Sequence, residues 1–301
     1  ATQTGTKYYV IGTYTTSVTA TFYYYNGSTQ TSTTANGTQT RNVWCSSDSA
    51  ASTDVKSNGN ITVPTAVTGS TGTHGEAYKG VATAVSSTTA VTPTTANTTY
   101  YAFYNGDKNE TVTATFYYSK SSDGTKGSVT GTGTQVRTYT STTNGTTYTT
   151  TGNTVKSEGN ITVPTLTGEV APYSTTAVGW STGASTIGST TPTTASTNWY
   201  RSYRTNVTVY RPTSASAASS ITVYRNSYYG TATKYTTVIA TGNTGTSNMT
   251  SISGLWSGVT FVGYATSSGT KTVGSGLTSI ASIATQTGTK YYVIGTYTTS
   301  V

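Results

Sequence analysis

The sequence predicts an all-β protein made of serial β-rich modules, and three observations lead to this prediction. Thr, Val and aromatic residues, which favour strands, are abundant, and the chain has 26 Tyr and 4 Trp. Alternation with period two is clear in residues 19–24 and 113–118. Helical periodicity is nearly absent, and residues 251–256 are the one segment in which we expect a helical turn.

Turn signals after the alternating stretches predict β-hairpins. Residues 19–24 lead into Asn26-Gly27, and residues 113–118 lead into Asp123-Gly124. The segment NITVP follows a glycine turn and ends at a proline, which stops strand pairing. With the segments YYAFY, WYRSY and YYVIGTY as further strands, we expect about six to eight short strands in each module.

The chain repeats itself at two levels. Residues 1–18 read ATQTGTKYYVIGTYTTSV, and residues 284–301 carry the same eighteen residues, so the period is 283 residues. We therefore expect one period plus an overlap from a longer tandem array. Within the period, VKSNGNITVPT at residues 55–65 returns as VKSEGNITVPT at residues 155–165.

These internal repeats divide the period into modules of roughly 95 residues. We expect modules at residues 17–110, 111–205 and 206–301, the third being divergent. Residues 1–16, a copy of residues 284–299, are expected to be the closing strand of a preceding module. Because a module of this size with few Leu is marginal alone, stacked neighbours are expected to stabilise one another.

Each module carries short motifs in a fixed order. In the first module they are Asn26-Gly27, Val63-Pro64, Lys79-Gly80 and Tyr100 to Tyr104, which includes Tyr101. In the second they are Asp123-Gly124, Val163-Pro164, Val178-Gly179-Trp180 and Trp199 to Tyr203, which includes Tyr200. In the third they are Val262-Gly263-Tyr264 and Tyr291 to Tyr297, which includes Tyr292. This order resembles the B-repeat of internalins, a Listeria and Bacteroides type surface repeat with Asn-Gly-Gly, Val-x-x-Pro, Phe-x-Gly-Trp and Thr-x-Tyr-Ala-x-Trp motifs.

The resemblance covers most of each module and implies a secreted bacterial surface protein whose repeats act as a stalk or an adhesive surface. It also implies a β-grasp-like fold. About thirty extra residues before Val-Pro and the lack of an evident central helix leave an immunoglobulin-like β-sandwich as the alternative. No signal-peptide pattern and no run of 18 apolar residues occur, so a signal peptide and an anchor are expected outside this segment.

Composition argues against several function classes. Charged residues make up 8% of the chain, and nucleophile-elbow, phosphate-loop and calcium-loop motifs are missing, so we expect no enzyme, metal or cofactor. The net charge of +8 comes from scattered Lys and Arg, which favours loose attraction to glycans or anionic envelope polymers over nucleic-acid binding. One cysteine, Cys45, cannot form an intramolecular disulfide.

Two local patterns carry candidate chemistry. His74 and Glu76 could serve as an acid–base pair, but they occur in one module, and a solvated loop is the simpler interpretation. Lys56 and Lys156, in VKSxGN, are candidates for a Lys–Asn isopeptide cross-link, with a solvated turn as the alternative.

The leading functional hypothesis is therefore an extended cell-surface fibre, stalk or filament that assembles from copies of itself. The alternative is an adhesin module that binds host or cell-surface glycans through exposed aromatic residues, and the divergent third module is the natural candidate. Modules arranged as beads and modules that exchange strands between periods both remain open.

Overall fold

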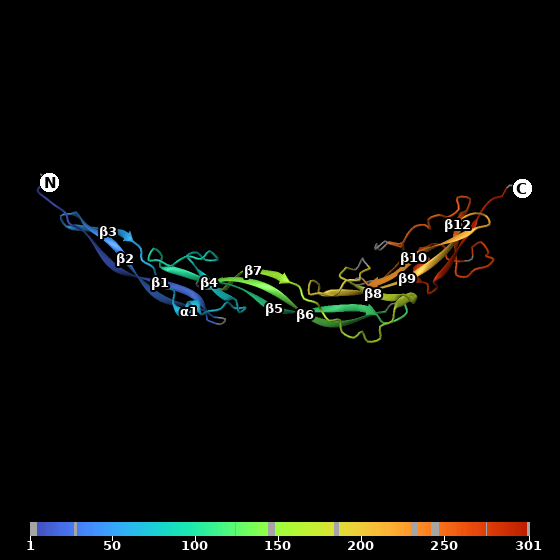
Figure 1. Ribbon diagram of the computed structural model, residues 1–301, viewed down its shortest axis with the longest axis horizontal. Helices are drawn as coiled ribbons and strands as arrows, with labels where there is room; N and C mark the ends of the chain where they lie inside the picture. The colour runs from blue at the N-terminus through green and yellow to red at the C-terminus, as the bar shows by residue number, and fades with distance from the viewer. Residues whose placement is uncertain are drawn as a thin grey trace. The chain divides into compact units, whose positions relative to one another are not determined.

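The computed structural model describes residues 5–26, 29–123, 125–143, 148–183, 187–229, 234–241, 247–274 and 276–299. The strands of Figure 1 are β1 (Ile11–Asn26), β2 (Thr29–Ser47), β3 (Ala50–Ser57), β4 (Ala77–Ala82), β5 (Thr99–Ser119), β6 (Lys126–Thr143), β7 (Tyr148–Ser157), β8 (Thr176–Ser181), β9 (Asn198–Pro212), β10 (Ala218–Tyr229), β11 (Lys234–Ala240), β12 (Thr260–Ala265) and β13 (Lys290–Thr296). The helical segments are α1 (Thr65–Thr68), η1 (Pro172–Ser174) and η2 (Ala281–Thr285). Strands dominate the described residues, so the all-β prediction is confirmed.

Two local predictions are wrong. Residues 251–256 form no helical turn, because Gly254 takes a φ of 68°, which a right-handed helix does not allow. The strands are also longer than predicted: β2 has 19 residues and β5 has 21. Asn36-Gly37 lies inside β2, where Gly37 pairs with Val18 of β1.

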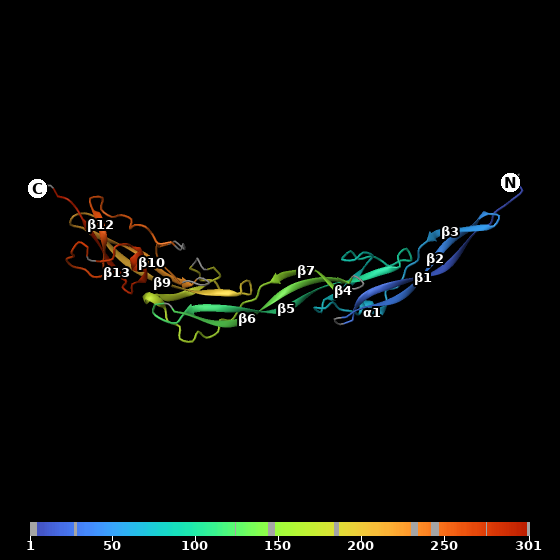
Figure 2. The ribbon, with the colours of Figure 1, turned by 180° about the vertical axis from the view of Figure 1, so that it is seen from behind.

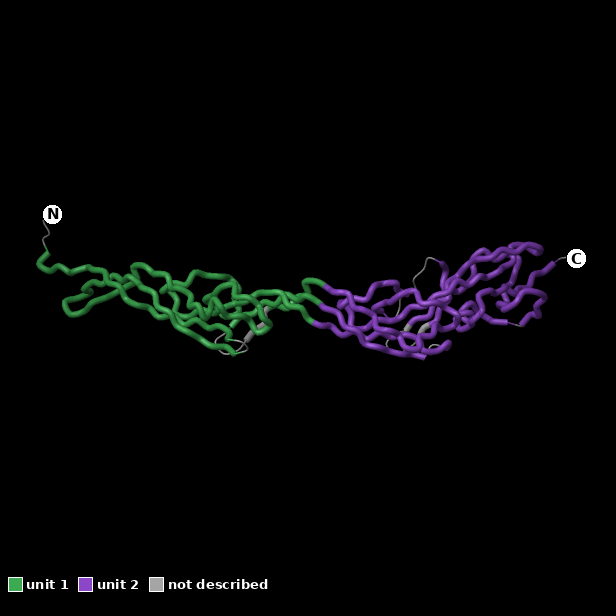
Figure 3. Tube along the Cα trace, turned by 60° about the horizontal axis from the view of Figure 1, so that its bottom comes forward, with its two compact units in different colours: residues 1–110, 135–157 green, residues 111–134, 158–301 purple. Residues whose placement is uncertain are grey.

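The chain divides into two compact units, shown in Figure 3. The first unit comprises residues 1–110 and 135–157, and the second unit comprises residues 111–134 and 158–301. The finer division into modules at residues 17–110, 111–205 and 206–301 stays a prediction.

The first unit is built on a mixed sheet in the order β2-β1-β5-β4. β1 pairs with β2 in antiparallel fashion, and residues 21–23 of β1 pair in parallel with residues 99–101 of β5. β4 pairs with the other edge of β5, and β3 extends the sheet beyond β2. The two hairpin strands β1 and β2 pair as predicted, whereas the turn residue Gly27 lies outside the described residues. The core of the unit includes Phe22, Val67 of α1, Val81 and Tyr100, all of which are buried.

The second unit contains the same strand order twice. In the order β6-β5-β9-β8, residues 115–117 of β5 pair in parallel with residues 198–200 of β9. In the order β10-β9-β13-β12, residues 208–210 of β9 pair in parallel with residues 290–292 of β13. Figure 2 shows β9, β10, β12 and β13 close together. The predicted turn residue Gly124 lies outside the described residues.

The mixed strand pairing bears on the predicted immunoglobulin-like sandwich. Immunoglobulin-like sandwiches consist of antiparallel sheets, whereas the described strands form one mixed sheet that contains three parallel pairings, β1 with β5, β5 with β9 and β9 with β13. The mixed pairing thus differs from that of an immunoglobulin-like sandwich, and a β-grasp-like module stays a prediction.

Candidate functional site

Both units contain parallel pairs in which a strand lies beside a strand that comes much earlier in the chain. We call the three late segments closing strands: residues 99–105 of β5, residues 198–204 of β9, and β13. Each has a parallel neighbour on one edge and an antiparallel neighbour on the other. Because both edges are paired, a closing strand ties the end of a repeat to its beginning.

Each closing strand buries an aromatic residue whose polar atom has a partner of its own. The side chains of Tyr100, Trp199 and Tyr291 are at most 1% exposed. The Tyr100 hydroxyl donates to the Thr94 carbonyl at 2.7 Å and accepts from its N–H, and the Trp199 indole donates to the Ser196 carbonyl at 3.1 Å. The Tyr291 hydroxyl instead accepts a hydrogen bond from Arg225 at 2.9 Å. The third closing strand is therefore anchored by a charged residue.

The next residue of each closing strand, a tyrosine in all three, stacks on a tyrosine of the parallel neighbour. Tyr101 stacks on Tyr23 with ring centroids 5.6 Å apart. The corresponding pairs are Tyr200 with Tyr117 at 5.2 Å and Tyr292 with Tyr210 at 4.9 Å. The motif residues Tyr101, Tyr200 and Tyr292 thus have equivalent positions, and cross-strand aromatic pairs of this kind stabilise sheets.

The motif glycines occupy β-bulges in the strand that flanks each closing strand. The register shifts at Gly80 in β4, at Gly179 in β8 and at Gly263 in β12. A Cβ at Gly179 would lie 2.4 Å from the Cα of Ser189, and one at Gly263 would lie 2.6 Å from the Leu277 carbonyl oxygen. Glycine is needed at these two bulges because another segment crosses the strand there.

The aromatic residues next to two of these glycines belong to the cores. Trp180 is buried and meets Phe116 edge-to-face with a centroid distance of 5.0 Å. Tyr264 is buried in the cluster that contains Val207, Val209 and Ile283. Both motif residues are therefore packing residues.

The Val-Pro motifs lie beside the cores. Val63 packs against the core of the first unit, and Pro64 directly precedes α1. Val163 packs against the cluster that contains Phe116 and Trp199, and Pro164 is half-buried. Their positions indicate a structural role.

Thr95 and Thr194 are structural residues that the sequence analysis missed. The Thr95 hydroxyl accepts from the N–H of Gly59 at 3.0 Å, and the Thr95 N–H donates to the Gly59 carbonyl at 2.9 Å. Thr194 makes the same two bonds with Gly159, at 3.0 and 2.8 Å. The string VKSxGN thus binds the string PTTA, which occurs at residues 93–96 and 192–195, in both places. The repetition of both strings together was the signal that could have revealed this contact.

Arg225 is a buried cation held by neutral acceptors. Its side chain is fully buried and donates to the carbonyl oxygens of Ile283 at 3.0 Å, Tyr173 at 3.1 Å and Gly288 at 2.6 Å, as well as to Tyr291. Burial lowers the pKa of Arg225 below its ordinary value. The guanidinium fork therefore fixes the start of β13 against β10 and η2.

The His74–Glu76 pair is part of a tied loop. Glu76 is buried, and its carboxylate accepts from the His74 N–H at 2.7 Å and from the Ser141 hydroxyl at 2.9 Å. The His74 ring stacks on Tyr139 with a centroid distance of 4.1 Å. The pair thus lies in a packed loop, which modifies the expectation of a fully solvated one.

Among the contacts of the described residues, neither cross-link candidate pairs with an asparagine. Lys56 is exposed near the end of β3, and Lys156 forms an exposed ion pair with Asp107. Asn58 accepts from Gln39 at 2.9 Å and from Thr95 at 3.1 Å. A cross-link at Lys56 or Lys156 stays a prediction, and Cys45 is an exposed free thiol.

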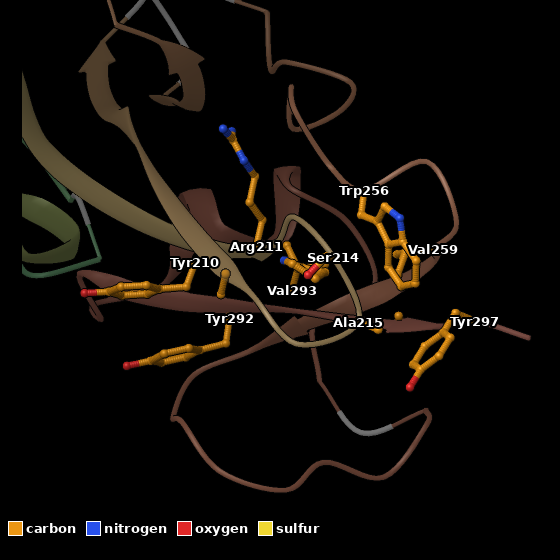
Figure 4. A pocket seen from close by; sticks show the side chains of 12 residues that line it. Tyr210, Arg211, Ser214, Ala215, Trp256, Val259, Tyr292, Val293 and Tyr297 are labelled. Atoms are coloured by element: carbon orange, nitrogen blue, oxygen red, sulfur yellow. The ribbon is translucent and has the colours of Figure 1, made fainter. Parts of the chain in front are cut away.

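An aromatic hollow of about 320 Å³ lies beside the third closing strand (Figure 4). Trp256 and Tyr297 line one side with ring centroids 5.3 Å apart, and the stacked Tyr210 and Tyr292 lie on the other side. The Arg211 guanidinium points away from the Trp256 ring and donates to the Ser253 carbonyl. The hollow thus presents mainly aromatic and small side chains.

A coordinated pair of residue changes accompanies the hollow. Tyr104 and Tyr203 in the first two closing strands accept hydrogen bonds from the backbone N–H groups of Tyr25 and Ser119, each at 2.9 Å. By strand register, the third site has Gly295 and Pro212 at these positions, and both line the hollow. Pro212 has no N–H to donate and Gly295 has no aromatic ring. The tyrosine and its hydrogen bond to the backbone, which the first two closing strands have, are therefore missing beside the hollow.

The buried tyrosines predict that stability falls at alkaline pH. Burial raises the pKa of Tyr264 to about 12, and it also raises the pKa of Tyr104 and Tyr291. Between pH 10 and about 12 the unfolded chain binds fewer protons at Tyr264 than the folded chain, so the free energy of unfolding is expected to fall as pH rises. Urea unfolding at pH 8 to 12 should show this fall, and Tyr264→Phe should make it shallower; an unchanged slope in the variant would contradict the assignment.

No family model, curated protein or solved structure matches the chain. None of the helices in the described part of the chain has the length and apolar character needed to cross a membrane.

Proposed function

We propose that the chain is a structural repeat of a secreted bacterial surface protein that forms an extended fibre, stalk or filament from tandem copies. The observation that carries this proposal is the threefold recurrence of the closing-strand site in a sequence that itself repeats after 283 residues. Repeats that each bury a thin core and stack on their neighbours are typical of elongated proteins.

Chains of one, two and three periods test this function. The longer chains join copies of residues 1–283 and end with residues 284–301. We expect the maximum particle length, measured by negative-stain electron microscopy and small-angle X-ray scattering, to rise by a constant increment per period. Length that grows only with the cube root of mass would show a compact assembly and reject the fibre.

The aromatic hollow supports a second candidate function, an adhesin that binds glycans. Exposed Tyr and Trp faces stack on sugar rings as they do on other amphipathic partners, and the hollow combines Trp256 with the half-exposed Tyr297. Its position in residues 206–301 agrees with the expectation that the divergent part carries such a site.

Glycan-array binding of the intact chain and two variants tests the adhesin. Tyr297→Ala should abolish binding of any glycan that the chain retains. Tyr14→Ala is the matched control, because Tyr14 is the same residue in the other eighteen-residue copy. Equal binding by both variants, or no glycan retained, would count against this function.

A further inference from the structure

The two identical eighteen-residue copies have different surroundings in the structure. In the C-terminal copy, Tyr291 is 0% and Ile294 is 7% exposed. The same residues of the N-terminal copy, Tyr8 and Ile11, are 66% and 78% exposed. Because the two sequences are identical, the side chains that are exposed in the N-terminal copy are the same ones that are buried in the C-terminal copy.

The copies also pair with different strands at equivalent residues. Residues 11–13 pair with residues 42–44 of β2, whereas residues 294–296, which are identical to them, pair with β12. In the pairings of the described residues, each copy is hydrogen-bonded to a neighbouring strand along only one of its edges at these positions.

β9 shows how both pairings fit on one strand. By register with the parallel ladders, residues 202–204 of β9 are equivalent to residues 294–296. These three residues pair with β8 on one side and with β10 on the other. β8 precedes β9 in the chain as β12 precedes β13, and β10 follows β9 as β2 follows β1. By this correspondence β12 and β2 pair with opposite edges of the strand, so they do not compete.

We propose that, between consecutive periods, the eighteen-residue copy is one continuous strand that holds β12 of the preceding copy on one edge and β2 of the following copy on the other. This inference rests on the proposed tandem array. The partner of the second edge of residues 11–13 is therefore β12 of another copy, and the junction is a paired strand like β9.

Arg225 of the preceding copy supplies the specific recognition. It donates to the Gly288 carbonyl and to the Tyr291 hydroxyl, and the identical residues of the N-terminal copy are Gly5 and Tyr8. The closing strand that carries Trp199 has no hydroxyl at this position, and the Tyr100 hydroxyl already bonds Thr94. The site is thus selective for the strand TGTKYY.

Hydrogen exchange on a chain of two periods tests the junction. Successive N–H groups of a strand point to opposite edges, so the two terminal copies should each protect a complementary subset of the amides in residues 11–13 and 294–296. In the central copy we expect all three amides to exchange at least 100-fold more slowly than the unprotected amides of the terminal copies. A central copy that shows the pattern of one terminal copy would overturn the proposal.

A substitution within the copies provides an independent measurement. Tyr8→Ala in the N-terminal copy is expected to lower the unfolding temperature less than the same change in the central copy, which should lower it by about 5 °C or more. Equal effects would contradict the role of the buried tyrosine at the junction. If particle length still rises evenly with the number of periods while the central amides exchange rapidly, the fibre stands and the paired junction fails.

Discussion

Replacing Arg225 by methionine is expected to lower the free energy of unfolding of the second unit by about 2–3 kcal/mol. The methionine side chain fills a similar space but donates no hydrogen bond. The carbonyl oxygens of Ile283, Tyr173 and Gly288 would then lose the donors that the guanidinium supplies at 2.6 to 3.1 Å. The full cost of desolvation falls on the buried Ile283 carbonyl, whereas the carbonyls of Tyr173 and Gly288 are only partly buried.

Urea unfolding of the intact chain, followed by tryptophan fluorescence, measures this loss. Lys271→Met is the matched control, because Lys271 hydrogen-bonds Ser267 at an exposed site. Arg225→Lys should give an intermediate loss, since it keeps the charge without the planar fork. A methionine variant within 1 kcal/mol of the Lys271 control would show that Arg225 does not anchor β13.

The sequence patterns predicted where strands occur, for local reasons, but not how long the strands are. Alternation of β-branched and aromatic residues is visible within a few residues, and it placed strands at residues 19–24 and 113–118. The repeated motifs also led to Gly80, Gly179 and Gly263, although the bulges that explain these glycines appear only in the structure.

Features that depend on distant partners could not be predicted in this way. Arg225 appears in the sequence as one scattered cation, and its partners at Tyr173 and Gly288 are more than fifty residues away. The length of β2 has the same origin, because β2 pairs with β1 from Thr29 to Trp44 and passes through Asn36-Gly37 without a turn. The hollow depends on Pro212 and Gly295 together, and neither residue alone signals a site.

Alanine at Gly159 is expected to destabilise the second unit by about 2–3 kcal/mol through steric overlap. The new Cβ would lie 1.9 Å from the Thr134 carbonyl oxygen, a distance that only a shift of backbone can relieve. Such a shift would also strain the hydrogen bonds that join Gly159 to Thr194, at 3.0 and 2.8 Å. Gly59→Ala should act in the same way on the first unit, because its Cβ would lie 2.1 Å from the Thr38 carbonyl oxygen.

Gly152→Ala is the control, because it stiffens the chain as the other two variants do but causes no steric overlap. The atom nearest to its new Cβ would be the Thr140 Cβ at an ordinary 3.5 Å. This variant is expected to be neutral or to stabilise by up to about 1 kcal/mol, because alanine restricts the unfolded chain. Differential scanning calorimetry should show a lower transition temperature for Gly159→Ala and for Gly59→Ala but not for Gly152→Ala. Equal transition temperatures in all three variants would mean that the VKSxGN loops do not need glycine. The close approach of Gly59 to Thr38 and of Gly159 to Thr134 would then not explain why this string repeats.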